Sequence, residues 1–336
     1  RGLFNLSADA GALPSERDQN FLLTADDGRK FVLKIADPGE KRGILEMQNE
    51  ALRRLAETAS GLCPKVFPNE AGEMISVVEE NGTSYFVRLV SYAEGVPLAV
   101  VRPRSLELLG RVGRAAGCLA RGLDGFDHPA AHRAFAWDLQ AGTAVVRRHL
   151  ELISEPARRA RVERWADWFD AEAAPGLAGL KRRVVHNDVN DYNVIIGPPA
   201  GGGPDFGRRL VAAIVDFGDM IHSYALAEPA AACAYAMLDK DDPLAAAAAV
   251  AAGFHAEWPL DEGEADRLYP LIVLRLLLSV SLCAYQTRLR PGDPYLEISN
   301  APVWALLEKL GAVPPALARA RLRHACGFTP CAAEEG

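Results

Sequence analysis

The chain has 336 residues, of which 49% are hydrophobic and 24% charged, as expected for a globular protein with a large core. The net charge is −7 and no basic block is present, which argues against nucleic acid as a partner. The 6 cysteines form no C-x-x-C pair. This favours buried thiols in a reducing cytoplasm over a disulfide framework or a zinc site.

Residues 1–91 predict a small lobe of strands and one helix. Two hairpin turns are indicated, Ala25-Asp26-Asp27-Gly28 and Asn81-Gly82, each between apolar runs. Residues 1–20 show no regular period and are expected to be irregular. In chain order, the expected elements are strands at 20–24 and 30–35, a helix at 40–60, and strands at 74–78 and 84–90.

Residues 92–330 predict a larger, mainly helical lobe, which follows a hinge at 91–97. The Gly/Pro-rich segment 197–207 is expected to be the tip of a hairpin whose second strand leads to Asp216. The most apolar run, 271–285, carries Arg275 and is shorter than the ~20 residues of a membrane span, so it predicts a core helix and no membrane partner. Further helices are expected at 105–122, 139–153, 156–171, 243–258 and 264–289, with a loop at 123–138.

Two polar motifs follow apolar runs in this larger lobe. The first is His186-x-Asp188-x-x-x-x-Asn193, and Asp216-Phe217-Gly218 begins 28 residues beyond Asp188. Either motif alone is common in turns, but the two in this order, flanked by β-branched residues, are typical of kinase-type phosphoryl transfer. We expect Asp188 to accept the proton of a substrate hydroxyl, and Asn193 and Asp216 to hold Mg²⁺. His186 is expected to brace the loop, with a role as catalytic base as the alternative.

The order strand, strand, helix, strand, strand is that of a kinase amino-terminal lobe. In that arrangement a strand lysine contacts the α- and β-phosphates of the nucleotide and is held by a glutamate on the following helix. We expect Lys34 and Glu50 in these roles. Lys34 could also be an ordinary exposed strand residue, Glu46 is a rival for Glu50, and Glu50 could instead pair with Arg54 on its own helix.

The expected phosphate-covering hairpin, residues 13–20, contains no glycine. Ser15, Gln19 and Asn20 are the candidates to donate hydrogen bonds to the phosphates, although they could equally be ordinary turn residues. Val90 and Tyr92 border the hinge, where backbone groups are expected to contact the nucleotide base. The sequence therefore does not determine which residues of this hairpin bind the phosphates.

These motifs resemble the aminoglycoside phosphotransferase and choline kinase superfamily, and within it the hydroxylysine kinases. The resemblance rests on residues 186–193 and on the segments 15–21, 125–129 and 135–139, and it covers nearly the whole chain. It implies an α+β, two-lobed protein-kinase-like fold, with a nucleotide-binding lobe at 1–91, a catalytic lobe at 92–330 and a tail at 331–336. The implied reaction is transfer of the γ-phosphoryl group of ATP or GTP to a hydroxyl of a small amine or amino acid, with Mg²⁺.

Acidic and aromatic residues near the catalytic motif predict a cationic substrate. An ammonium group would balance the carboxylates, and aromatic rings would add cation–π contact. Asp191 could instead cap a turn and Glu228 could begin a helix, which are common roles for these residues. The expected acidic residues are Asp138, Asp191, Asp219 and Glu228, the aromatic residues are Trp137, Tyr192 and Tyr224, and the candidates to bind a substrate carboxylate are Arg17, Arg88 and Arg275.

The same motifs leave other activities open. These are a kinase of ethanolamine or choline, homoserine or an aminoglycoside, and a pseudokinase domain that binds nucleotide without turnover. A hydrolase is disfavoured because the chain has no G-x-S-x-G motif. Hydroxylysine-kinase-like domains also occur fused ahead of a pyridoxal-phosphate-dependent aminotransferase-like domain. Because the chain begins at Arg1 without Met, we hypothesise that it is a domain of such a polypeptide.

Overall fold

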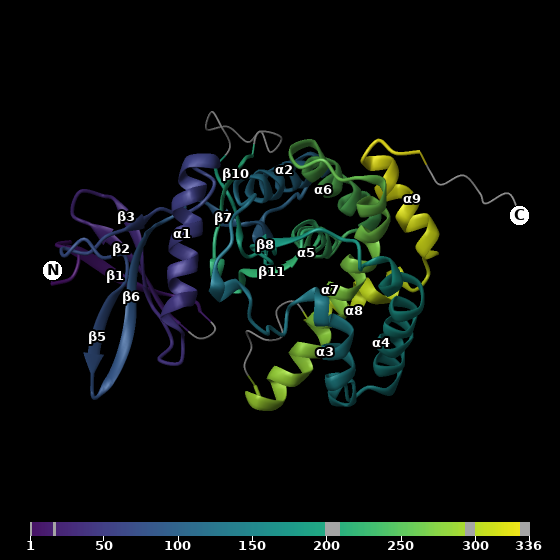
Figure 1. Cartoon of the computed structure of the whole chain (residues 1–336), viewed down its shortest axis with the longest axis horizontal. Helices are drawn as coiled ribbons and strands as arrows, with labels where there is room; N and C mark the ends of the chain where they lie inside the picture. The colour runs from purple at the N-terminus through teal and green to yellow at the C-terminus, as the bar shows by residue number, and fades with distance from the viewer. Residues whose placement is uncertain (1, 16–17, 199–208, 293–299, 330–336) are drawn as a thin grey trace, which may run out of the picture.

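The computed structural model describes residues 2–15, 18–198, 209–292 and 300–329 (Figure 1). Strands dominate the amino-terminal part, at the left of Figure 1, and helices dominate the remainder. Helix α1 (Arg42–Thr58) stands between the two parts. The expected α+β, two-lobed arrangement is therefore confirmed.

The small lobe contains one antiparallel sheet in the order β1-β2-β3-β6-β4, and β5 also pairs with β6. The predicted turns are present, with Gly28, Asn81 and Gly82 at positive φ as tight hairpins require. Residues 8–13 were expected to be irregular but form a strand, in which Leu13 lies opposite Asn20. The strands are β1 (Ala8–Leu13), β2 (Gln19–Ala25), β3 (Lys30–Ile35), β4 (Val66–Phe67), β5 (Ser76–Glu80) and β6 (Thr83–Ser91).

Helix α1 joins the two lobes because it buries residues on two of its faces. Leu45 packs with Ala36 and Ile75 of the small lobe. Met47 and Leu55 belong instead to the main core, which continues into the large lobe. The helix therefore fixes the sheet and its Lys34 relative to the catalytic motifs.

The described part of the large lobe is mainly helical and carries two small sheets, one of three strands in the order β10-β9-β7 and one in which β11 pairs with β8. The region expected as one helix at 139–153 is divided, because short 3₁₀ turns flank α3. The helices are α2 (Leu106–Gly122), α3 (Gly142–His149), α4 (Pro156–Trp168), α5 (Ala227–Ala236), α6 (Pro243–Glu257), α7 (Glu262–Leu289), α8 (Asn300–Leu310) and α9 (Pro315–Ala325). The strands are β7 (Val96–Pro97), β8 (Arg182–Val185), β9 (Val194–Ile196), β10 (Val211–Ile214) and β11 (Ile221–Tyr224).

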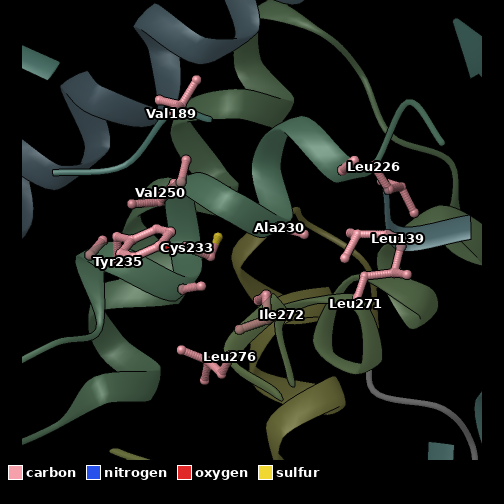
Figure 2. Packing of buried hydrophobic residues seen from close by; sticks show 14 of the residues in the cluster. Leu139, Val189, Leu226, Ala230, Cys233, Tyr235, Val250, Leu271, Ile272 and Leu276 are labelled. Atoms are coloured by element: carbon pink, nitrogen blue, oxygen red, sulfur yellow. The ribbon is translucent and has the colours of Figure 1, made fainter. Parts of the chain in front are cut away.

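Helix α7 forms the centre of this lobe. Figure 2 shows Ile272 and Leu276 of α7 near Cys233 of α5, and these three side chains are fully or almost fully buried. The helix is long and apolar enough to cross a membrane by composition, but 83% of its most apolar window is buried inside the fold. This burial agrees with the core helix that the sequence predicted.

Helices α2 and α6 cross at glycines. A Cβ atom added to Gly113 would lie 2.0 Å from the carbonyl oxygen of Val250, and one added to Gly253 would lie 2.0 Å from that of Gly110. Because both obstacles are backbone atoms, they cannot move aside as a flexible side chain could. The close approach of the two helices therefore requires glycine at these positions.

We predict that Gly113→Ala lowers the free energy of unfolding by about 3 kcal/mol, since overpacked sites in dense cores typically cost this order. Urea unfolding followed by circular dichroism measures the change. Gly179→Ala is the matched control, because a Cβ there meets nothing within 4 Å. Equal unfolding midpoints for the two variants would contradict the proposed steric limit.

Candidate active site

The two catalytic motifs meet at the end of the β9–β10 hairpin. Ile214 of β10 pairs with Val194 of β9, and one residue further the Val215 N–H donates to the Asn193 carbonyl oxygen at 2.9 Å. Asn193 precedes β9 and Asp216 follows β10, so the two residues lie at the same end of this strand pair. Residues that are distant in sequence become neighbours because two buried apolar strands pair.

His186 lies inside the protein and braces the catalytic loop. Its Nδ1 accepts the Asp188 N–H at 3.2 Å, and its Nε2 lies 3.1 Å from the Val215 carbonyl oxygen, to which it donates in the neutral Nε2–H form. Burial lowers the pKa of His186, which favours this neutral form. Both ring nitrogens are engaged and the residue is 0% exposed, so the alternative role as catalytic base is not supported.

Glu228 supports the same loop from α5. Its Oε2 accepts the backbone N–H of His186 at 2.7 Å, and the residue is only 1% exposed. Burial raises the pKa of this carboxyl group, and the nearby His186 opposes the rise. The predicted substrate contact for Glu228 is therefore wrong, because its carboxyl group is enclosed and holds the loop backbone.

Asp188 has hydrogen-bond donors on both carboxylate oxygens. Oδ1 accepts from Arg275 Nη2 at 2.7 Å, and Oδ2 accepts from the side-chain amides of Asn190 at 3.0 Å and Asn193 at 2.7 Å. Burial raises the pKa of Asp188, while the charge of Arg275 acts in the opposite direction. The side chain remains 19% exposed, so a small acceptor has access to it.

Asp216 begins the second motif in a left-handed conformation, with φ at 63°. Its side chain is 57% exposed, and its Oδ1 lies 3.6 Å from Nζ of Lys34 on β3. The charge of Lys34 is the main cause that lowers the pKa of Asp216. The carboxylate therefore stays ionised and faces the space between the lobes near Lys34.

The predicted pairing of Lys34 with Glu50 is not formed. Lys34 pairs with Asp216, whereas Glu50 is exposed on α1. The rival Glu46 is bound to Arg42 at 2.8 Å on the same helix. Helix α1 uses its two buried faces for apolar packing, which leaves Glu50 facing solvent.

Amide side chains of α1 bind another cation of the sheet, Arg88. Arg88 on β6 is directly opposite Lys34 in the sheet and is 3% exposed. Its guanidinium donates to Gln48 Oε1 at 2.7 Å and to Asn49 Oδ1 at 2.9 Å. Arg88 is therefore enclosed in the small lobe with both terminal nitrogens engaged, which makes it unsuited to bind a substrate carboxylate.

Asn193 and Asp216 together fit a magnesium ion. The amide nitrogen of Asn193 donates to both the backbone oxygen and Oδ2 of Asp188, which leaves its oxygen as the atom available to a cation. With the exposed carboxylate of Asp216, this makes two hard oxygen ligands of the kind that Mg²⁺ prefers. Among the described residues no group of three or more His, Cys, Asp or Glu side chains makes a metal site, so phosphate and water would supply the other ligands.

The expected phosphate loop is only partly described, since residues 16–17 lie outside the described ranges. Ser15 and Gln19 are exposed, whereas Asn20 lies directly opposite Lys34 on the neighbouring strand. The Oδ1 atom of Asn20 is buried without a hydrogen-bond partner among the described residues. Asn20 is thus the loop residue nearest to Lys34 in the sheet register.

The hinge residues lie where the chain passes between the lobes. Val90 is buried and pairs with Val32 and Val66 on either side. Tyr92 donates its backbone N–H to the Lys30 carbonyl oxygen at 3.3 Å, and its ring lies 5.7 Å from Nζ of Lys30. The two residues expected to contact the base therefore lie at the carboxyl end of β6, in the sheet that carries Lys34.

Asp191, which was expected to contact the substrate, is instead paired with a cation of the protein. It lies 3.5 Å from Arg104 of the segment before α2, and both side chains are buried. Burial raises the pKa of Asp191 to about 6, and the charge of Arg104 opposes this rise. A residue enclosed in this way is unsuited to meet a substrate ammonium, so the expectation for Asp191 is corrected.

The loop before α3 contains Asp138 and Trp137, of which Trp137 contacts the residues around Asp188. Asp138 accepts the hydroxyl of Ser223 and the backbone N–H of Gln140, so it caps the 3₁₀ turn that follows. The Trp137 ring lies 4.5 Å from the Arg275 guanidinium. The cation expected over Trp137 is thus a protein side chain, not the substrate.

The remaining predicted substrate residues differ in their exposure. Tyr192 is 39% exposed beside the catalytic loop, and Asp219 is partly buried in the turn after Asp216. Tyr224 is buried, with the Arg182 guanidinium 5.7 Å from its ring. Tyr192 and Asp219 therefore remain the candidates for contact with an acceptor.

Sequence reasoning did not predict the structural roles of two arginines that hold the site. Arg133 donates to the carbonyl oxygens of Gly218 at 2.7 Å and Met220 at 3.2 Å, and so supports the turn after Asp216. Arg275 was noted as a charge within an apolar run, but its partner Asp188 was not foreseen. A lone charged residue in an apolar core helix indicates that it has a buried partner, whereas an arginine in a polar loop does not indicate any partner.

Comparison with known proteins identifies the family. Residues 10–264 match the phosphotransferase enzyme family. Hydroxylysine kinase of Mus musculus is 30% identical over 316 residues, which cover 89% of this chain and 83% of that protein.

Solved structures give the same fold. A microcompartment-associated aminopropanol kinase matches with a TM-score of 0.71 and 17% identity, over 92% of this chain and 94% of that one. The amicoumacin kinase hAmiN, in complex with AMP-PNP, Ca²⁺ and Ami, matches with a TM-score of 0.67 and 15% identity, over 93% and 91%. With its sequence matches, the chain therefore belongs to the phosphotransferase enzyme family.

Proposed function

We propose that this phosphotransferase moves the γ-phosphoryl group of ATP or GTP to a hydroxyl of a small amine or amino acid of the hydroxylysine type. The observation that carries the proposal is the grouping of Asp188, Asn193 and Asp216 at the end of one hairpin, with Lys34 3.6 Å from Asp216. This grouping contains a proton acceptor, two hard oxygen ligands and a phosphate-binding cation. Phosphoryl transfer needs these parts together.

The side chains have separate roles in the reaction. Lys34 attracts the nucleotide phosphates toward Asp216. Asp188 accepts a hydrogen bond from the acceptor hydroxyl and aligns that oxygen with the γ-phosphorus. When bound between Asn193 and Asp216, Mg²⁺ would neutralise phosphate charge. His186 and Glu228 keep the loop backbone in place, so the reacting groups need little rearrangement.

The nucleotide is proposed to lie between the small lobe and the catalytic loop. Asn20, beside Lys34 in the sheet register, is the favoured loop contact for the phosphates, with Ser15 and Gln19 as further candidates. Val90 and Tyr92 border the base. The amicoumacin kinase complex with AMP-PNP supports a nucleotide co-substrate, because the same fold holds a nucleotide there.

The proposed acceptor follows from the relatives and from the charges that remain exposed. Similarity to mouse hydroxylysine kinase over most of the chain favours a hydroxylated amino acid. Asp219, which is partly exposed in the turn after Asp216, is the proposed carboxylate for an ammonium group, and Tyr192 is the proposed aromatic contact. A pseudokinase is disfavoured because Asp188, Asn193 and Asp216 are all present and adjacent.

We predict that Lys34→Met weakens nucleotide binding roughly ten- to a hundredfold, the effect of losing one charge-assisted contact of about 1.5–3 kcal/mol. Methionine keeps the apolar stem, so the melting temperature should change little. Isothermal titration with ATP and with GTP measures the loss. Lys41→Met is the control, because Lys41 is exposed in the same lobe. Equal nucleotide affinities for both variants would contradict a phosphate-binding role for Lys34.

The acceptor class is tested with a panel at fixed nucleotide and magnesium. The panel contains hydroxylysine, ethanolamine, choline, homoserine, an aminoglycoside and a neutral sugar, and release of nucleoside diphosphate gives the rates. We expect the highest kcat/KM for hydroxylysine, because an ammonium group complements Asp219. A preference for the neutral sugar would contradict a cationic acceptor, and a preference for the aminoglycoside would overturn the hydroxylysine assignment alone.

A further inference from the structure

Arg275 is a charged residue at the centre of the apolar helix α7, and it is 1% exposed. Its Nη2 donates to Asp188 Oδ1 at 2.7 Å and its Nη1 donates to the Asn187 carbonyl oxygen at 3.0 Å. The guanidinium carbon lies 4.5 Å from the Trp137 ring and 5.6 Å from the Tyr235 ring. Two hydrogen bonds and two aromatic rings, which come from separate parts of the chain, therefore hold the Arg275 guanidinium in place.

The donors around Asp188 leave its two oxygens unequal. A carboxylate oxygen offers two lone-pair sites. Oδ2 already accepts from the amides of Asn190 and Asn193, whereas Oδ1 accepts from Arg275 alone. Among the described residues, Oδ1 is therefore the oxygen that keeps a site for an incoming hydroxyl.

We propose that Arg275 is a positioning residue that holds Asp188 with the open site of Oδ1 directed at the acceptor hydroxyl. The inference rests on the proposed function. In the step, the acceptor oxygen bonds to the γ-phosphorus while the bond from that phosphorus to the leaving diphosphate breaks. The hydroxyl proton passes to Oδ1, beside the guanidinium, and the nucleoside diphosphate leaves. Arg275 touches neither the acceptor nor the phosphates and acts through Asp188.

The geometry also excludes the role first expected for Arg275. A receptor for a substrate carboxylate must present two donors in an open fork. Both terminal nitrogens of Arg275 are already bound to Asn187 and Asp188, and Trp137 and Tyr235 lie close to the guanidinium. Asp219 and Tyr235 are the further ionisable groups that interact with it. An amino-acid acceptor must therefore bind its carboxylate elsewhere.

The test is chemical rescue of Arg275→Ala. We expect kcat to fall on the order of a hundredfold, the effect of misplacing a catalytic group by about 1 Å, with nucleotide affinity within about twofold of the parent. Added methylguanidinium should restore kcat in a saturable way, because it fills the vacated space with the same charge and donors. Urea, which has a similar shape and no charge, should not restore it.

Arg323→Ala is the matched control for loss of a buried arginine. Arg323 is 4% exposed and is paired with Glu262 at 2.8 Å and Asp266 at 2.9 Å, on the α7–α9 side of the lobe. We expect this variant to lose thermal stability while it keeps the parent kcat. If Arg275→Ala fails to fold, Arg275→Lys takes its place. The lysine keeps the positive charge but lacks the planar guanidinium that donates to two acceptors at once. The kcat of this variant should therefore still fall, with nucleotide affinity unchanged.

Two results would overturn the inference. One is a folded Arg275 variant with the parent kcat, and the other is recovery with urea equal to that with methylguanidinium. Nucleotide hydrolysis without an acceptor is measured in parallel, because water then replaces the hydroxyl. If the unsubstituted protein hydrolyses nucleotide but phosphorylates nothing in the acceptor panel, the proposed acceptor is contradicted. The hydrolysis rates of the unsubstituted protein and of the Arg275 variants would then still decide the role of Arg275.

Discussion

The catalytic centre depends on the balance of charges that are buried under the catalytic loop. Asp188 faces Arg275, and Asp191 faces Arg104, and these side chains have little exposure. An unpaired charge in such a place costs several kcal/mol, and removal of one partner from a buried pair is strongly destabilising. The loop can therefore carry several carboxylates because protein cations already neutralise them. Asp216, which is paired with Lys34, is the most exposed of these carboxylates, and its exposure suits it to a metal ion.

The catalytic motifs were predictable because their local context is encoded within a few residues. Apolar runs before His186, after Asn193 and before Asp216 indicate strands, and polar residues between buried strands indicate a loop. The Asp-Gly and Asn-Gly turns likewise indicated the hairpins of the small lobe. Asn193 and Asp216 could be placed together because antiparallel strands return to the same end.

The partners of these residues were not predictable, because they come from remote parts of the chain. Arg275 is 87 residues from Asp188, and Arg104 is 87 residues from Asp191. Sequence spacing cannot show which arginine neutralises which carboxylate. Glu50 failed as a partner for a similar reason: its helix packs against both lobes, and the orientation that results turns Glu50 to solvent. The strand at residues 8–13 was missed because its composition is poor in β-branched residues and pairing with β2 determines it.

Asp188 and Asp216 are neighbours in space, and we propose that they have different functions. The most direct measurement compares kcat and the dissociation constant of magnesium-nucleotide for Asp188→Asn and Asp216→Asn. We expect Asp188→Asn to keep nucleotide affinity while kcat falls by about a hundredfold or more, as for loss of a positioned general base. We expect Asp216→Asn to weaken magnesium-nucleotide binding itself. A parent-like kcat in Asp188→Asn, or a parent-like nucleotide affinity in Asp216→Asn, would contradict this division.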